Sequence, residues 1–157
     1  MNKPLVIGLG NPFRGDDGAG WAVIDALKGK VPAAVKLCKL SGDIAELIDV
    51  FADHSTVYLI DACFTDSLSG SWQRIDARLH PIPLDAPQTS THGLSVSQAI
   101  DLAKAFNQLP EKLIIYAISG DQYNMCSTLS APVAQVIDIV AQNILNEEDI
   151  RTCTKKA

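Results

Sequence analysis

A chain of 157 residues, of which 47% are hydrophobic and 20% charged, can bury a core and is globular rather than disordered. Its formal net charge of -5 at pH 7, with Lys155-Lys156 as the only basic cluster, argues against a nucleic-acid partner. No segment approaches the roughly 18 apolar residues of a membrane-spanning helix, and the apolar start is too short for a signal-peptide core. We therefore expect no membrane partner and a cytoplasmic location.

The first half of the chain alternates short apolar runs with segments whose apolar residues recur at helical spacing. The runs predict buried strands, and the helical spacing predicts helices packed on a sheet. The elements expected here are a strand over residues 4–9, a helix over 17–28, a strand over 34–40, a helix that follows Ser41-Gly42-Asp43 and continues to Phe51, and a strand over 56–60. The first strand ends at the turn Gly10-Asn11-Pro12, and the last ends at Asp61.

The second half begins with a segment of a different kind. Residues 70–77 alternate in polarity, which is typical of an edge strand and suits an antiparallel direction. The proline-rich residues 79–90 are expected to form a loop whose length indicates a function. A helix over 95–107 with Phe106 on its apolar face, a strand over 112–118 and a helix over 131–145 follow, and the polar residues after Asn146 are expected to fray.

Strands that alternate with helices indicate a parallel α/β sheet. We predict a single three-layer α/β/α domain over residues 1–147, in which a twisted, mostly parallel sheet has one antiparallel edge strand. Residues 148–157 are assigned to a polar C-terminal tail. None of the four cysteines belongs to a Cys-x-x-Cys pair, so we expect reduced, mostly buried thiols.

Polar side chains gather where this fold binds ligands, beyond the carboxyl ends of the strands. Asn11, Asp16 and Asp17 follow the first strand, Asp61 ends the third, and His92 lies in the proline-rich loop. Two carboxylates and one imidazole from three separate loops suit zinc, nickel or a similar divalent ion, and three protein ligands leave coordination positions open. We therefore interpret Asp17, Asp61 and His92 as a metal-binding group.

The glycine-rich start has two other interpretations. Asp16 or Asp17 can cap the following helix, because a carboxylate there satisfies free backbone N–H groups. Gly8-x-Gly10 also suggests a dinucleotide-binding turn, but the third glycine of that motif would fall at Phe13, and a pyrophosphate would meet the two carboxylates.

These residues together resemble the hydrogenase maturation proteases, the endopeptidases that process the large subunit of nickel–iron hydrogenases. The resemblance covers nearly the whole chain. It is carried by Gly8-Leu9-Gly10-Asn11 with Asp16-Asp17-Gly18-Ala19-Gly20, by Leu59-Ile60-Asp61-Ala62, and by Ser90-Thr91-His92-Gly93-Leu94. This chain has Asp17 where family members often carry glutamate, and Ser119-Gly120-Asp121-Gln122 where they usually show a Glu-Pro pair.

The resemblance implies that Asp17, Asp61 and His92 are both the metal ligands and the catalytic residues, with Gly10, Asn11 and Asp16 supporting them. It also implies a substrate, the precursor of a hydrogenase large subunit that already carries nickel, from which a C-terminal peptide is removed. The nickel is brought by the precursor, and zinc or cadmium are expected to fit the same ligands.

Several alternatives stay open at this point. The enzyme is metal-dependent if nickel polarises the scissile carbonyl or activates water, and aspartyl-type if a carboxylate such as Asp17 is the general base. Peptidyl-tRNA hydrolases also open with Gly-Leu-Gly-Asn-Pro, although Asp16-Asp17-Gly18 stands here in place of their Thr-Arg-His-Asn segment. A third alternative is a non-enzymatic, nickel-binding maturation chaperone. We expect a monomer that meets its client transiently.

Overall fold

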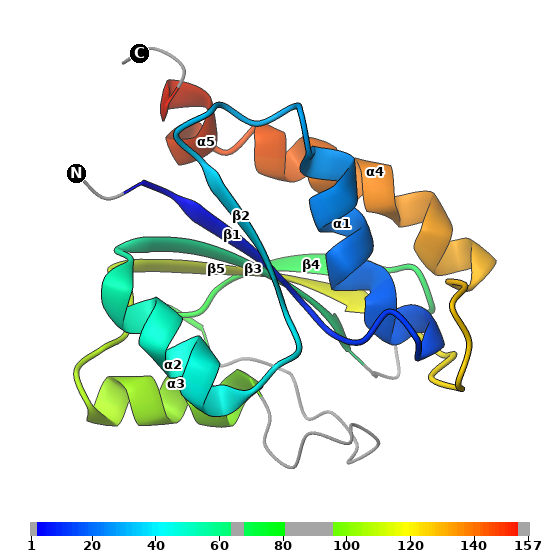
Figure 1. Cartoon of the computed structure of the whole chain (residues 1–157), viewed down its shortest axis with the longest axis horizontal. Coiled ribbons are helices and arrows are strands. Elements are labelled where there is room, and N and C mark those ends of the chain that lie inside the picture. Colours follow the sequence, from blue (N-terminus) through cyan, green and yellow to red (C-terminus); the bar gives the residue numbers. More distant parts are fainter. Residues whose placement is uncertain (1–2, 64–67, 81–95, 154–157) are drawn as a thin grey trace.

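The computed structural model of the chain describes residues 3–63, 68–80 and 96–153, which form a five-stranded sheet between two layers of helices (Figure 1). In chain order the elements are β1 (Leu5–Leu9), the short 3₁₀ helix η1 (Gly15–Gly18), α1 (Ala19–Leu27), β2 (Lys36–Leu40), α2 (Ile44–Asp53), β3 (Thr56–Cys63), β4 (Trp72–Asp76), α3 (Val96–Ala105), β5 (Lys112–Ser119), α4 (Ala131–Leu145) and α5 (Glu148–Thr152). No helix in these ranges is long and apolar enough to cross a bilayer.

The strand order is β2-β1-β3-β5-β4, and only β4 runs antiparallel to its neighbour. The predicted antiparallel edge strand is therefore confirmed. The central strands β3 and β5 contain uninterrupted apolar runs, Val57–Ile60 and Leu113–Ile118, which are buried throughout. Such runs are expected where helices cover both faces of a strand.

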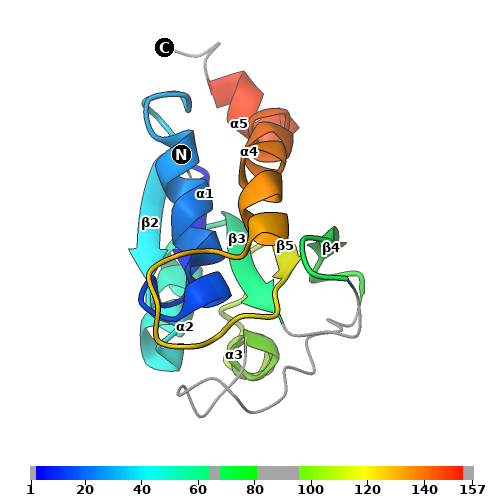
Figure 2. The same cartoon turned by 90° about the vertical axis from the view of Figure 1, so that its right-hand side faces the viewer.

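Each face of the sheet has its own apolar layer, because successive side chains of a strand point to opposite faces. On one face Ile7, Leu59 and Ile115 pack with residues of α2 and α3. On the other face Val6, Ile60 and Ile114 pack with residues of α1, α4 and α5. Figure 2 shows the sheet between these two groups of helices. The predicted three-layer α/β/α architecture is confirmed.

Helix α1 lies unusually close to the sheet because two glycines face each other. A Cβ atom on Gly8 would lie 2.3 Å from the carbonyl oxygen of Gly20, and one on Gly20 would lie 2.5 Å from that of Leu9 and 2.7 Å from that of Ile60. These separations leave no room for a methyl group. The glycines therefore set how closely the start of α1 approaches β1 and β3.

Replacing Gly20 with alanine tests this close contact. Helix propensity alone predicts that alanine stabilises the helix by about 1 kcal/mol. Because the added methyl group would overlap two backbone carbonyls, we expect the opposite sign, a loss of about 1–3 kcal/mol in the free energy of unfolding. Urea denaturation followed by circular dichroism measures it, and a variant more stable than the wild type would contradict the close packing.

Several predicted boundaries differ from the structure. Asp17 lies in η1 rather than in α1, and β3 continues to Cys63 instead of stopping before Asp61. Helix α3 ends at Ala105, and Phe106, predicted on its apolar face, is 63% exposed because it follows the last helical turn. All four cysteines are free as expected, but only Cys63 is buried, so the expectation of mostly buried thiols is wrong.

The chain does not fray from residue 146, because residues 148–152 form α5 and its Ile150 is only 1% exposed. Two acidic residues next to Ile150 fix this helix to the sheet. Glu147 accepts hydrogen bonds from Arg74 of β4 and Tyr116 of β5, and Asp149 from Tyr58 of β3 and Lys112 of β5. We call these six residues the α5 clamp. The sequence does not predict the α5 clamp, because no local pattern pairs its strand residues with Glu147 and Asp149.

Candidate functional site

The candidate site lies where the parallel strands β1, β3 and β5 end, which we call the carboxyl edge of the sheet. From β1 the chain first passes to β2 on one side, and β3 then lies on the other side of β1. The connections on the two sides of β1 therefore diverge, and this is where open α/β sheets bind their ligands. The segment after β1 and the end of β3 carry the predicted acidic residues to this point.

Asp61 lies on β3 just beyond the end of its pairing with β1. The last paired residues of the two strands are Gly8 and Ile60, whereas pairing with β5 continues to Cys63. Burial removes water from the Asp61 carboxyl group, and the negative charge of Asp17 lies close to it. Both effects raise the pKa of Asp61 well above its usual range, and a hydrogen bond from the backbone of Ala62 opposes them only in part.

Asp17 is positioned by the tight turn between β1 and η1. The backbone N–H of Asn11 donates to Oδ2 of Asp17 at 3.1 Å, and the Asn11 side chain accepts from the N–H of Phe13 at 2.9 Å. Gly10 has a φ of +135°, and a Cβ atom there would lie 1.9 Å from the carbonyl oxygen of Asp17. Gly10 and Asn11 therefore shape the turn that carries Asp17.

Asp16, the neighbouring residue, has a different role, because its side chain is completely buried. Its carboxylate accepts hydrogen bonds of 2.8 to 3.0 Å from the backbone N–H groups of Asp121, Gln122 and Ser130 and from the Ser130 hydroxyl. Burial alone would raise the pKa of Asp16, but these hydrogen bonds outweigh it and lower the pKa below its usual value.

The alternative that Asp16 caps a helix is therefore wrong. The residues at the cap positions of η1 and α1 are Arg14 and Gly18, and neither makes a side-chain capping bond. Asp16 instead ties η1 to the segment between β5 and α4, 105 or more positions away in the chain. It holds together the two loops on either side of the site.

Tyr123, in the segment between β5 and α4, was not predicted as a site residue. Its hydroxyl donates to the carbonyl oxygen of Cys63 at 3.0 Å, at the end of β3. Burial raises the pKa of Tyr123, and the nearby Cys63 thiol and the carboxylates of Asp61, Asp17 and Asp16 raise it further. A single tyrosine in a polar loop carries no sequence signal for this position, which depends on how the segment folds back over β3.

His92, the third predicted metal ligand, lies outside the described residues. The structure thus brings together two of the three, Asp17 and Asp61. Within the ranges described, no three histidine, cysteine, aspartate or glutamate side chains are placed to hold a metal ion. The chemistry of the pair nevertheless suits a cation, because a desolvated carboxyl group next to a second carboxylate is costly to ionise unless a positive charge compensates it.

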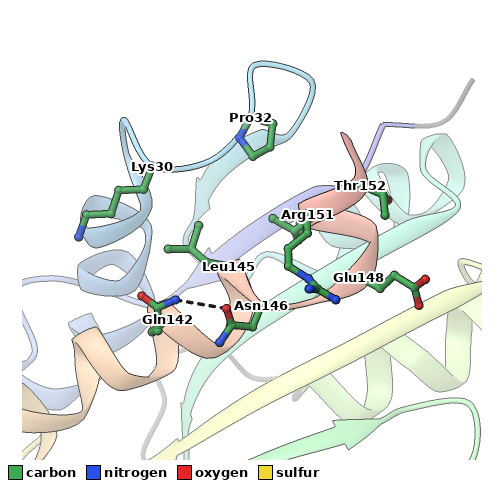
Figure 3. A pocket seen from close by; sticks show the side chains of 9 residues that line it. Lys30, Pro32, Gln142, Leu145, Asn146, Glu148, Arg151 and Thr152 are labelled. Carbon is green, nitrogen blue, oxygen red and sulfur yellow. Dashed lines mark hydrogen bonds between the residues drawn. The ribbon is translucent and has the colours of Figure 1, made fainter. Parts of the chain in front are cut away.

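A separate cavity of about 570 Å³ lies at the opposite edge of the sheet, between the α1–β2 connection, the end of α4 and α5. Figure 3 shows Lys30 and Arg151 on its walls, with the side chain of Gln142 donating to Asn146 at 3.3 Å. It contains none of the predicted site residues, so we do not assign it to the reaction.

A sequence model described as HycI, hydrogenase maturation protease, matches residues 22–147. The chain belongs to the hydrogenase maturation protease family. As a member of a protease family it is a hydrolase, which favours the endopeptidase interpretation over a peptidyl-tRNA hydrolase or a dinucleotide-binding protein. The matched residues include the positions of Asp61 and His92, and Asp17 precedes them. A comparison with curated proteins gave no match.

Solved structures of the same family share the fold. The hydrogenase maturating endopeptidase HybD from E. coli is 21% identical with a TM-score of 0.73, over 91% of this chain and 90% of that chain. An endopeptidase from Escherichia coli, solved in solution, is 20% identical with a TM-score of 0.79, over the same shares of both chains. The [NiFe] hydrogenase maturation protease HycI from Thermococcus kodakarensis KOD1 is 20% identical with a TM-score of 0.72, over 96% of this chain and 93% of that chain.

Proposed function

We propose that the chain is an endopeptidase that removes a C-terminal peptide from the precursor of a nickel–iron hydrogenase large subunit after nickel insertion. In this proposal Asp17, Asp61 and His92 bind the nickel that the precursor carries. The observation that supports it most directly is the position of Asp61 on β3, just beyond the end of its pairing with β1, where the charge of Asp17 lies close enough to raise the pKa of Asp61. A divalent ion delivered to this point compensates both carboxylates.

This arrangement makes recognition of the precursor depend on the nickel that it carries. Without a cation the two carboxylates oppose each other's ionisation, so an empty precursor gains little by contacting them. With nickel held on its other side by the precursor, both side chains become ligands, and the ion compensates the charge that opposes ionisation of Asp61. Affinity for the loaded precursor therefore exceeds affinity for the empty one, and the protease acts after nickel insertion.

The cleavage step can use these groups in two ways, which differ in how they depend on the ion. Nickel can polarise the scissile carbonyl or activate a water molecule. Alternatively, the carboxylate of Asp17 or Asp61 takes a proton from the attacking water, and a raised pKa brings an aspartate closer to the range in which a general base is efficient. Comparing nickel, zinc and cadmium in the precursor separates them, because the rate of the first route follows how strongly the ion polarises a bound carbonyl or water, whereas the second route needs the ion only as an anchor.

The decisive experiment incubates the purified protein with large-subunit precursor, with and without bound nickel, and reads the products by mass spectrometry. We expect loss of a C-terminal peptide only from the loaded precursor. Equal cleavage of both forms would contradict nickel recognition. A stable complex with loaded precursor but no cleavage would instead identify a maturation chaperone. Size-exclusion chromatography of the same samples tests the expected monomer and its transient complex.

Substitutions at Asp17 and His92 test their assignment as ligands. Asp17→Glu keeps the charge and lengthens the side chain by one methylene, so we expect it to retain more activity than Asp17→Asn, which has the size of aspartate but no charge. His92→Ala is expected to abolish cleavage while circular dichroism shows an unchanged fold. Rates on nickel-loaded precursor are compared, and full activity in His92→Ala would contradict the three-ligand assignment.

A further inference from the structure

Two large apolar side chains are exposed on the loops that build the candidate site. Phe13, between β1 and η1, is 66% exposed, and Met125, between β5 and α4, is 83% exposed. Isolated exposed apolar residues are common and need no explanation. These two are not isolated, because the backbones that carry them run side by side.

The pairing between the two loops places Phe13 and Met125 at neighbouring positions. Arg14 and Cys126 form an isolated parallel β-bridge, so Phe13 and Met125, which precede them, stand at neighbouring positions of the two backbones. Gly15 donates to the carbonyl oxygen of Cys126 at 2.8 Å, and Asp16 donates to that of Gln122 at 2.6 Å. Figure 2 shows the loop before α4 running alongside the turn that leads into α1.

Both loops are held in place before any partner arrives. The turn before η1 is fixed by two hydrogen bonds that Asn11 accepts. Its side-chain oxygen accepts from the N–H of Phe13 at 2.9 Å, and its carbonyl oxygen accepts from the N–H of Arg14 at 3.2 Å. The buried carboxylate of Asp16 binds the N–H groups on both sides of Met125, at Gln122 and at Ser130. A surface ordered in this way loses little conformational entropy on binding, so apolar contact made there is converted efficiently into affinity.

We propose that Phe13 and Met125 form a docking surface for an apolar side chain of the client precursor, in the segment next to the scissile bond. The inference rests on the proposed function. Asn11 is bonded to both Asp17 and Phe13, so Phe13 lies within a few residues' reach of a peptide bond that contacts Asp17. The aspartates beside it disfavour an acidic segment, whereas an aromatic ring and a flexible thioether favour an apolar one.

The test measures cleavage of nickel-loaded precursor by a double variant, Phe13→Ser with Met125→Ser. We expect KM to rise about tenfold or more, because most of the apolar contact is lost. We expect kcat to stay within about twofold, because these side chains bind the substrate and its transition state alike. Phe106→Ser is the matched control, since Phe106 is 63% exposed but lies at the end of α3. A second double variant, Phe13→Leu with Met125→Leu, is expected to restore KM.

The other possible results distinguish a failure of the docking surface from a failure of the proposed function. A wild-type KM in the serine double variant overturns the docking surface and leaves the proposed function intact. A lower kcat at unchanged KM also overturns it, because the residues would then act on the reaction step. A wild-type protein that fails to cleave loaded precursor refutes both proposals. If sedimentation shows a wild-type dimer that the double variant cannot form, the surface serves self-association instead, and the client proposal is overturned.

Discussion

Replacing Asp61 with asparagine is expected to abolish cleavage and, at the same time, to make the unliganded protein more stable at neutral pH. Under the proposed function, activity is lost because asparagine supplies no charge to the nickel of the precursor. Stability rises because the wild-type carboxyl group is desolvated beside Asp17, which raises its pKa in the folded state. A group with a raised folded pKa stabilises the fold fully below its unfolded pKa and loses that contribution as the pH rises through the folded value.

The pH dependence identifies this cause. Below about pH 4, the ordinary pKa of an aspartate, Asp61 is protonated in both states and the advantage of asparagine disappears. Thermal unfolding at about pH 3 and pH 7 measures the difference. Asp121→Asn is the matched control, because the Asp121 side chain is exposed at the same edge of the sheet and should change little at either pH. A less stable Asp61→Asn variant at pH 7 would show that Asp61 is compensated within the protein itself.

Replacing Asp16 with alanine is expected to have the opposite effect on stability and to cost about 3 kcal/mol or more in the free energy of unfolding. The substitution leaves three backbone N–H groups and the Ser130 hydroxyl without their buried acceptor. Since the pKa of Asp16 is lowered in the folded state, its contribution is present above the unfolded pKa and is lost as the pH falls through the folded value.

Three variants that remove different numbers of these hydrogen bonds show whether the loss of stability comes from the hydrogen bonds to Asp16 or from removing any charge at this surface. Ser130→Ala removes one of the four hydrogen bonds to Asp16 and should cost about 1 kcal/mol, whereas Asp121→Ala leaves all four in place and should cost little. Urea denaturation gives the stabilities, and the gap between Asp16→Ala and the wild type should narrow in acid. An Asp16→Ala variant that loses no more than Ser130→Ala would contradict the network.

The order and type of most helices and strands could be predicted because their apolar residues recur at the spacing typical of each element. The apolar runs that end at Ile60 and Ile118 indicated buried strands, and the alternation of strands with helices indicated a mostly parallel sheet in three layers. The same reasoning predicted that the acidic residues at the ends of the first and third strands share one edge of the sheet. The alternation of residues 70–77 correctly indicated the antiparallel edge strand β4.

What could not be predicted depends on contacts between distant parts of the chain. Asp16 and Asp17 are adjacent and chemically identical, yet one is buried against residues more than 100 positions away and the other lies close enough for its charge to act on Asp61. Tyr123 is near the site only because its segment folds over the end of β3. Helix α5 looked polar because Ile150 is its single buried residue, and the partners of its acidic neighbours lie on three strands.

The α5 clamp also determines from which side the protein can be attached to a solid support. It fastens the last described helix across β3, β4 and β5 near the amino ends of the parallel strands, and Cys153 packs against the same layer (Figure 1). A linker attached beyond this residue therefore leaves from the side of the protein that faces away from Asp17 and Asp61. Protein coupled to a solid support through such a linker would leave the carboxyl edge of the sheet accessible to a partner as large as another folded protein.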